Sequence, residues 1–106
     1  MTDWTPDDLK SALDKNGSVF LKLWKKGCGI CKLSVPATDR LEAANPHSLS
    51  FARIDVDEFP EMLEIAETES LPTFFVFAGG AMKDKFIGFK GLDKLQQFVD
   101  GAMASK

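Results

Sequence analysis

The sequence is poor in the residues that build metal sites, disulfide frameworks and membrane spans. Among its 106 residues are two cysteines and one histidine, and no apolar run approaches the roughly 18 residues of a membrane-spanning helix. Two cysteines cannot form the several-bridge framework of a small secreted protein. The chain does contain nine Phe, two Trp and 44% apolar residues, which excludes intrinsic disorder. Its length predicts one domain, residues 1–106, that can bury a core without covalent staples.

Charge is unevenly distributed along the chain. The net charge of -3 and the pI of about 5.1 disfavour nucleic acid as a partner. Residues 18–38 contain four lysines and no acid, whereas residues 55–69 contain seven acids and no base. We interpret the acidic block as the solvated face of a helix. The lysines surround the cysteines in the sequence and predict that acidic partners are favoured, with an association rate that depends on ionic strength.

The cysteines, Cys28 and Cys31, are separated by Gly29 and Ile30. A bridge between them closes a very small loop and constrains the unfolded chain little, so a purely structural role is weak. Half of a zinc site is a second interpretation, but His47 is the only histidine, so carboxylates or a second chain would have to complete the four ligands. A redox pair is the third interpretation. It requires a strand before the pair and a helix that begins at it.

Hydrophobic periodicity and turn residues predict four helices and four strands. Thr5 followed by Pro6 and two acids is typical of a helix start, and the apolar run at 19–24 is typical of a strand buried on both faces. A helical stretch follows the cysteines to about residue 44 and should bend at Pro36. The remaining predicted elements are a strand at 51–56, a helix at 59–68, a strand at 73–77, a hairpin turn at Gly79-Gly80, an edge strand at 83–88 and a helix at 92–103.

The resulting order, α-β-α-β-α-β-β-α, predicts an α/β fold with a mixed sheet covered by helices on both faces. The cysteine pair follows a buried strand and opens a helix, which is the placement that the redox interpretation requires. No apolar stripe is left without a partner, so we expect a monomer.

With these elements in place, the sequence resembles the thioredoxin family over nearly the whole chain. The matching residues are Trp24, Cys28, Cys31, Lys32, Pro36, Asp57, Pro60, Leu71, Pro72, Thr73, Gly79, Gly80 and Gly88. A lone Cys-x-x-Cys is a weak signal, whereas the same pair with a Pro-Thr at this distance and this order of elements is a specific one. The resemblance implies a thioredoxin fold in which the family's first strand is short or missing.

The resemblance also implies roles for individual residues. Cys28 would be the exposed nucleophile, Cys31 the buried resolving thiol, and Pro72 a cis proline beside them. Leu71, Pro72 and Gly88 would line a surface on which an extended substrate segment docks. The other candidates for substrate binding are Trp24, Gly27, Gly29 and Ile30, of which Trp24 is expected mainly to pack beside the site.

The residues around Cys28 favour the thiolate, which is the attacking species. A helix N-terminus and the charges of Lys25, Lys26 and Lys32 should lower the pKa of Cys28. Cys28 would attack a substrate disulfide, and Cys31 would then attack Cys28 and release the reduced product.

The expected function is therefore thiol–disulfide oxidoreductase, a reductase of protein disulfides that is itself kept reduced by a flavin-dependent thioredoxin reductase. The cysteine pair is the redox group, and we expect no metal, no bound cofactor and no membrane partner. The polar, acidic start of the chain lacks a secretory signal, which predicts the cytoplasm unless a leader was removed. Two alternatives stay open. One is an oxidant, isomerase or dedicated-partner protein with an atypical potential; the other is a non-catalytic binding module, against which the intact cysteines weigh.

The sequence departs from the family pattern at four positions. Gly27 stands where thioredoxins usually carry Trp, and Ile30 where they usually carry Pro, so the reduction potential stays open. Lys22 stands where they carry a buried Asp thought to handle the proton of the resolving cysteine, and Arg53 replaces the lysine that partners this Asp.

Two interpretations of Lys22 compete. In one, the side chain reaches solvent or pairs with an acid such as Asp55, because isolated buried charges are rare. In the other, Lys22 is partly buried behind the cysteines with a lowered pKa and stabilises a thiolate or relays a proton. The single histidine, His47, is expected to be a solvated surface residue.

Overall fold

The computed structural model describes residues 1–104 of the chain. In this part of the chain the elements are β1 Thr2–Asp3, α1 Pro6–Asp14, β2 Val19–Trp24, α2 Gly29–Leu33, α3 Val35–Ala44, β3 Ser50–Asp55, α4 Glu61–Ala66, β4 Thr73–Ala78, β5 Ala81–Ile87 and α5 Leu92–Ala104. The order agrees with the predicted one apart from two additions: the family's first strand is present but only two residues long, and the helix after the cysteines is divided into α2 and α3.

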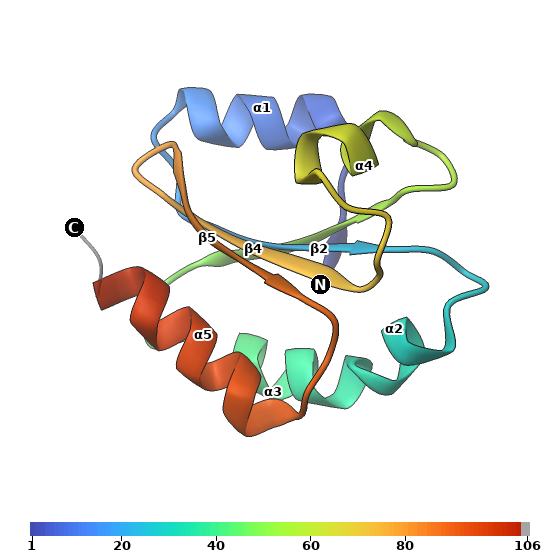
Figure 1. The fold of residues 1–106 in the computed structure, drawn as a ribbon. Coiled ribbons are helices and arrows are strands. Elements are labelled where there is room, and N and C mark those ends of the chain that lie inside the picture. The colour runs from blue at the N-terminus through green and yellow to red at the C-terminus, as the bar shows by residue number, and fades with distance from the viewer. Residues whose placement is uncertain (105–106) are drawn as a thin grey trace.

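The strands form one mixed sheet in the order β1-β3-β2-β4-β5. β3 runs parallel to both β1 and β2, whereas β4 runs antiparallel to both β2 and β5. Helices α1 and α4 cover one face of the sheet, and α2, α3 and α5 cover the other (Figure 1). This confirms the predicted α/β fold. It also puts β2, the strand that leads to the cysteines, in the centre of the sheet.

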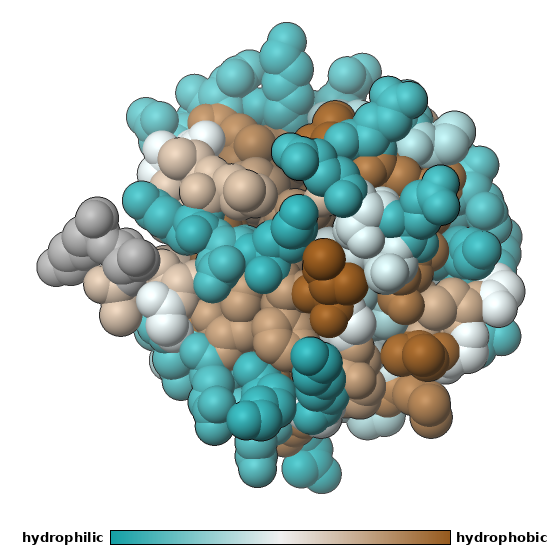
Figure 2. Space-filling view, viewed as in Figure 1, coloured by the Kyte–Doolittle hydropathy of each residue, from teal (hydrophilic) through white to brown (hydrophobic). Residues whose placement is uncertain are grey.

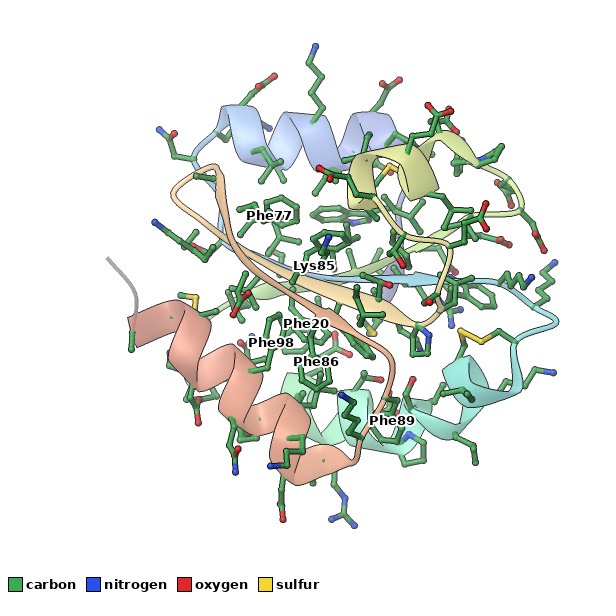
Figure 3. All side chains as sticks on the ribbon, in the orientation of Figure 1. Phe20, Phe77, Lys85, Phe86, Phe89 and Phe98 are labelled. Carbon is green, nitrogen blue, oxygen red and sulfur yellow. A yellow bond between two sulfur atoms is a disulfide. The ribbon has the colours of Figure 1, made fainter. Side chains whose placement is uncertain are left out.

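Each face of the sheet buries its own hydrophobic cluster. Leu21 and Leu23 of β2 pack toward α1 and α4, whereas Phe20 packs toward α3 and α5, where Phe98 also lies (Figure 3). Side chains alternate between the two faces along a strand. Lys22 therefore falls on the same face as Phe20, under the helices that follow the cysteines.

The predicted helix after the cysteines is two helices. α2 ends at Leu33, α3 begins at Val35, and Ser34 lies between them. Pro36 has no N–H and cannot donate the helical hydrogen bond back to Lys32. The bend expected at Pro36 is thus a break two residues earlier.

Two turns set the remaining boundaries. α4 is shorter than the predicted helix at 59–68 because Glu67 adopts a left-handed φ of 58° and ends it. Gly79 and Gly80 make the predicted hairpin turn with φ values of 60° and 81°. A side chain at Gly80 would lie 2.6 Å from the main-chain oxygen of Leu13, so only glycine fits there.

Hydrophobic side chains are exposed over α2 and the start of α3 (Figure 2), where Ile30, Leu33 and Val35 reach the surface. Within residues 1–104, no helix has the length and apolar character needed to cross a bilayer.

Candidate active site

Cys28 and Cys31 lie at the start of α2, just beyond the end of β2, and are joined by a disulfide (Figure 3). Their Cα atoms are 5.3 Å apart. Cys28 is the N-cap of α2, and its Sγ accepts a hydrogen bond from the Cys31 N–H at 3.1 Å. The Cys28 N–H donates to the main-chain oxygen of Lys25 at 3.2 Å, which closes the turn after β2. The pair thus occupies the strand–helix junction that the redox interpretation requires.

The two cysteines differ in accessibility. Cys28 is half-buried, whereas Cys31 is only 1% exposed. Gly27, Gly29 and Ile30 around them are exposed. A substrate that approaches this end of the molecule therefore meets Cys28 first.

The surroundings of Cys28 are positively charged. Lys25, Lys26 and Lys32 are all exposed near it, and no salt bridge in residues 1–104 engages them. Positive charge and the hydrogen bond from the Cys31 N–H both stabilise a thiolate at Cys28 relative to the thiol.

Lys22 is buried in β2 behind the pair. Its side chain is 2% exposed, and its Nζ donates a hydrogen bond to the main-chain oxygen of Cys31 at 2.9 Å. Burial, and to a lesser extent repulsion from Arg53, lower the pKa of Lys22 to about 8, and attraction by Asp39 opposes both effects. The interpretation in which Lys22 reaches solvent or pairs with Asp55 is wrong, because the side chain projects from a central strand under α2 and α3 and ends at Cys31.

Ser34 shares this contact. Its side chain is fully buried, and its Oγ donates to the same Cys31 oxygen at 2.7 Å. Two donors from different elements therefore converge on one carbonyl. Sequence reasoning missed Ser34, although a serine followed two residues later by Pro36 is a recognisable helix start.

The loop before β4 lies at the same end of the sheet as the cysteines. Leu71–Pro72 is a cis peptide bond, as the resemblance implied. The oxygen of Pro72 accepts a hydrogen bond from the Gly88 N–H at 2.7 Å, so these two predicted residues lie together. Leu23 pairs with Thr73 in the β2–β4 register, which brings this loop beside the end of β2. Pro72 is buried, whereas Leu71 and Gly88 are half-buried.

A hollow of about 410 Å³ lies between this loop and the turn after β2. It is lined by Lys25, Val56, Asp57, Pro60, Leu63, Glu69 and Leu71. One lysine and two carboxylates, Asp57 and Glu69, thus line the same hollow as the predicted docking residue Leu71.

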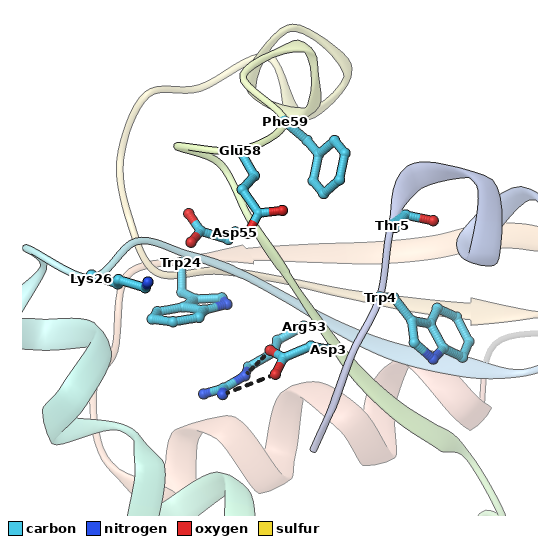
Figure 4. A pocket seen from close by; sticks show the side chains of 9 residues that line it. All are labelled: Asp3, Trp4, Thr5, Trp24, Lys26, Arg53, Asp55, Glu58 and Phe59. Carbon is cyan, nitrogen blue, oxygen red and sulfur yellow. Dashed lines mark hydrogen bonds and ion pairs between the residues drawn. The ribbon is translucent and has the colours of Figure 1, made fainter.

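Trp24 lines a second hollow of about 330 Å³ (Figure 4). The Arg53 guanidinium lies 4.4 Å from the centre of the Trp24 ring and donates to Asp3 at 2.6 Å. Trp24 is half-buried and shares this hollow with Lys26, which precedes the cysteine pair in the chain. Arg53 is thus held by Trp24 and Asp3 at the β1 edge of the sheet rather than by an acid on β2.

The described residues contain no group of three or more His, Cys, Asp or Glu side chains placed to hold a metal ion. His47 lies away from the cysteines and is hydrogen-bonded to Asp100 at 2.9 Å. It is therefore paired rather than freely solvated, and the contact lowers the pKa of Asp100.

Comparison with known proteins agrees with this geometry. The sequence profile of the thioredoxin family matches residues 1–101. Thioredoxin of Staphylococcus aureus is 31% identical over 96 residues, which are 91% of each chain. The bifunctional thioredoxin reductase/thioredoxin of Mycobacterium leprae is 33% identical over 79 residues, 74% of this chain and 17% of that longer protein. The crystal structure of oxidised mitochondrial thioredoxin 3 from Saccharomyces cerevisiae superposes with a TM-score of 0.84 at 25% identity, over 95% of this chain and 94% of that one.

Proposed function

The chain belongs to the thioredoxin family and is a thiol–disulfide oxidoreductase, and we propose that it reduces protein disulfides with Cys28 as the attacking and Cys31 as the resolving cysteine. The observation that carries this assignment is the unequal exposure of the pair: Cys28 is half-buried at the helix start, and Cys31 is 1% exposed. A large substrate disulfide can reach only the first.

The reaction starts from the dithiol. The Cys28 thiolate attacks one sulfur of the substrate disulfide, a Cys28–substrate bond forms, and the other substrate sulfur leaves as a thiolate that takes up a proton. The Cys31 thiolate then attacks the Cys28 sulfur, forms the intramolecular disulfide and expels the second substrate thiolate. The substrate gains two electrons, and the cysteine pair loses two.

We place the substrate segment across the exposed Gly27, Gly29 and Ile30 and against the loop that contains Leu71 and Pro72. The hollow beside Leu71 would receive a substrate side chain. Trp24 and Gly88 border this surface from the β2 and β5 sides of the site.

For the electron donor we propose a thioredoxin reductase, since the Mycobacterium leprae relative unites a thioredoxin reductase and a thioredoxin in one chain. The redox group would be the cysteine pair alone. We further propose that the protein acts as a monomer in the cytoplasm, a compartment in which thiols are kept reduced. Sedimentation of the purified chain and cell fractionation test these two points, and a dimer or a mitochondrial fraction would contradict them.

Trapping of substrates tests the cysteine roles. In Cys31→Ser the mixed disulfide cannot be resolved, so substrate proteins should accumulate on Cys28 and appear on non-reducing gels. Cys28→Ser should trap none and should fail to reduce insulin with dithiothreitol as the electron source. Equal trapping by the two variants would overturn the assignment.

The second candidate function is an oxidant, in which electrons flow from the substrate to the cysteine pair, or an isomerase. The observation that favours it is the buried cation at Lys22, together with Gly27 and Ile30 around the pair. Equilibration with glutathione buffers separates the two. A potential near about −270 mV supports the reductase, and one well above about −200 mV supports an oxidant or isomerase. If a Cys28→Ser/Cys31→Ser double variant still bound its partners and restored function, a binding module would replace both.

A further inference from the structure

Lys22 has a hydrogen-bond partner but no counter-ion. No salt bridge in residues 1–104 includes it, and its ammonium donates to the uncharged carbonyl of Cys31. The charged groups that act on it are Arg53 of β3, which is repulsive, and Asp39 of α3, which is attractive. A buried charge without an ionic partner is costly. The contact that Lys22 does make is with the cysteine expected to resolve the mixed disulfide.

An anion arises at this place during the proposed reaction. While Cys28 is bonded to a substrate sulfur, Cys31 is the only free thiol of the chain, because the sequence contains two cysteines. Cys31 is 1% exposed, so water stabilises its thiolate poorly and burial alone would raise its pKa. A cation in contact with the same residue offsets this effect.

We propose that Lys22 is a positioning residue for the resolving step, a proposal that rests on the function proposed above. Together with Ser34, Lys22 holds the main chain of Cys31. Its ammonium is the counter-ion of the Cys31 thiolate while Cys28 is bonded to the substrate. The Cys31 thiol loses its proton to water. The resulting thiolate attacks the Cys28 sulfur, and the substrate thiolate leaves and takes up a proton. Lys22 stays protonated throughout and gains its ionic partner only while Cys31 is charged.

This assignment reverses the role that the family pattern gives to the same position. An acid there can accept the proton of the resolving thiol, but its charge opposes a thiolate beside it. A lysine stabilises the thiolate directly.

The experiment measures the pKa of Cys31 in a Cys28→Ser background, where Cys31 is the only thiol, from the ultraviolet absorbance of the thiolate as pH is raised. Lys22→Met should raise this pKa by about one unit, which is a tenfold loss of thiolate at a fixed pH below it. Lys22→Gln should raise it similarly, because Gln can still donate to the Cys31 oxygen but carries no charge. Lys22→Arg should keep the parental value. The control is Lys10→Met, since Lys10 is an exposed lysine of α1, on the opposite face of the sheet (Figure 1).

A second readout uses both cysteines. The chain is loaded with glutathione on Cys28, and release of glutathione is followed against pH. The pH profile of release should move upward by about one unit in Lys22→Met and stay in place in Lys10→Met. An unchanged Cys31 pKa in folded Lys22→Met, or a parental value in Lys22→Gln, would overturn the counter-ion role. Neither measurement uses a protein substrate, so failure here is distinct from failure of substrate trapping.

Discussion

The ammonium of Lys22 and the main-chain oxygen of Cys31 are 2.9 Å apart, and both residues are almost completely buried. A cation from the centre of the sheet thus contacts the less accessible partner of the redox pair. The charge of Lys22 should therefore affect both the free energy of unfolding and the reactivity of Cys31.

The stability of the oxidised protein should depend on pH through Lys22. Its pKa is about 8 in the folded chain, compared with 10.5 for an ordinary lysine, which we take for the unfolded chain. Between these two pH values the unfolded chain binds more protons than the folded chain, so the free energy of unfolding rises with pH. The full lowering of the Lys22 pKa corresponds to a loss of about 3 kcal/mol in the free energy of unfolding at pH 7. Lys22→Met removes this loss but also removes the hydrogen bond to Cys31, which subtracts about 1 kcal/mol from the gain. This variant should therefore be more stable than the parent by about 2 kcal/mol at pH 7.

Urea unfolding from pH 7 to 10.5, with the disulfide intact, measures this difference. The charged groups that act on Lys22 are Arg53, which repels it, and Asp39, which attracts it. The advantage of Lys22→Met should disappear as pH rises through the interval. A difference that stays constant with pH would show that the buried amine does not titrate as described.

Removal of the Ser34 hydroxyl should weaken the junction between α2 and α3. Ser34→Ala loses one buried hydrogen bond to the Cys31 oxygen but leaves that oxygen bonded to Lys22. The expected loss is about 1 kcal/mol in the free energy of unfolding. Ser50→Ala, at an exposed position, should change it much less. Equal effects of the two substitutions in urea unfolding would contradict a structural role for the Ser34 hydroxyl.

The aromatic cluster under α3 and α5 should carry much of the stability. Phe74 is fully buried, with its ring centre 5.6 Å from that of Phe20. Phe74→Ala should cost about 3–5 kcal/mol. Ile65→Ala removes an apolar side chain that is 67% exposed and should stay within about 0.5 kcal/mol of the parent. The two variants are compared by their midpoints of urea unfolding, provided that the dependence of the free energy on urea concentration is the same in both. Similar midpoints for both variants would refute this prediction.

The exposed lysines beside Cys28 should accelerate reaction with acidic substrates. The rate of reduction of a disulfide in an acidic peptide should fall as salt rises, because exposed charges are screened over about 10 Å at 0.1 M salt. Lys25→Gln and Lys32→Gln together should lower the rate at low salt and flatten its dependence on salt. Lys10→Gln on α1 is the control, since Lys10 is exposed on the opposite face of the sheet. Identical rates at low and high salt would exclude this steering.

Local patterns were sufficient to predict most of the framework of the site. Thr5 caps α1 as expected, with its side chain accepting from the Asp8 N–H at 3.2 Å. The apolar run at 19–24 is the central strand, and Gly79-Gly80 is the hairpin turn. These features depend on residues close together in the chain, and their chemistry allows few alternatives.

Boundaries were harder to predict. The helix after the cysteines breaks at Ser34 rather than bending at Pro36, and the helix predicted at 59–68 is only Glu61–Ala66. Pro36 cannot donate the hydrogen bond that would continue α2 into α3, and Ser34 lies at the resulting break with its hydroxyl bonded to Cys31. Glu67 ends α4 by adopting a left-handed φ. Hydrophobic periodicity predicts neither the exact position of the break nor the left-handed residue.

The sequence by itself determined the order of the elements, the Cys28–Cys31 pair at a helix start and the face of β2 on which Lys22 lies, because these depend on spacing and alternation along the chain. Only the tertiary structure decided what happens to the charge of Lys22. A lysine side chain on a strand can reach solvent if an edge or a gap is near, but here β3, β4 and the helices after the cysteines enclose it. Its ammonium is held at the Cys31 carbonyl because the packing of distant segments leaves that oxygen as its partner.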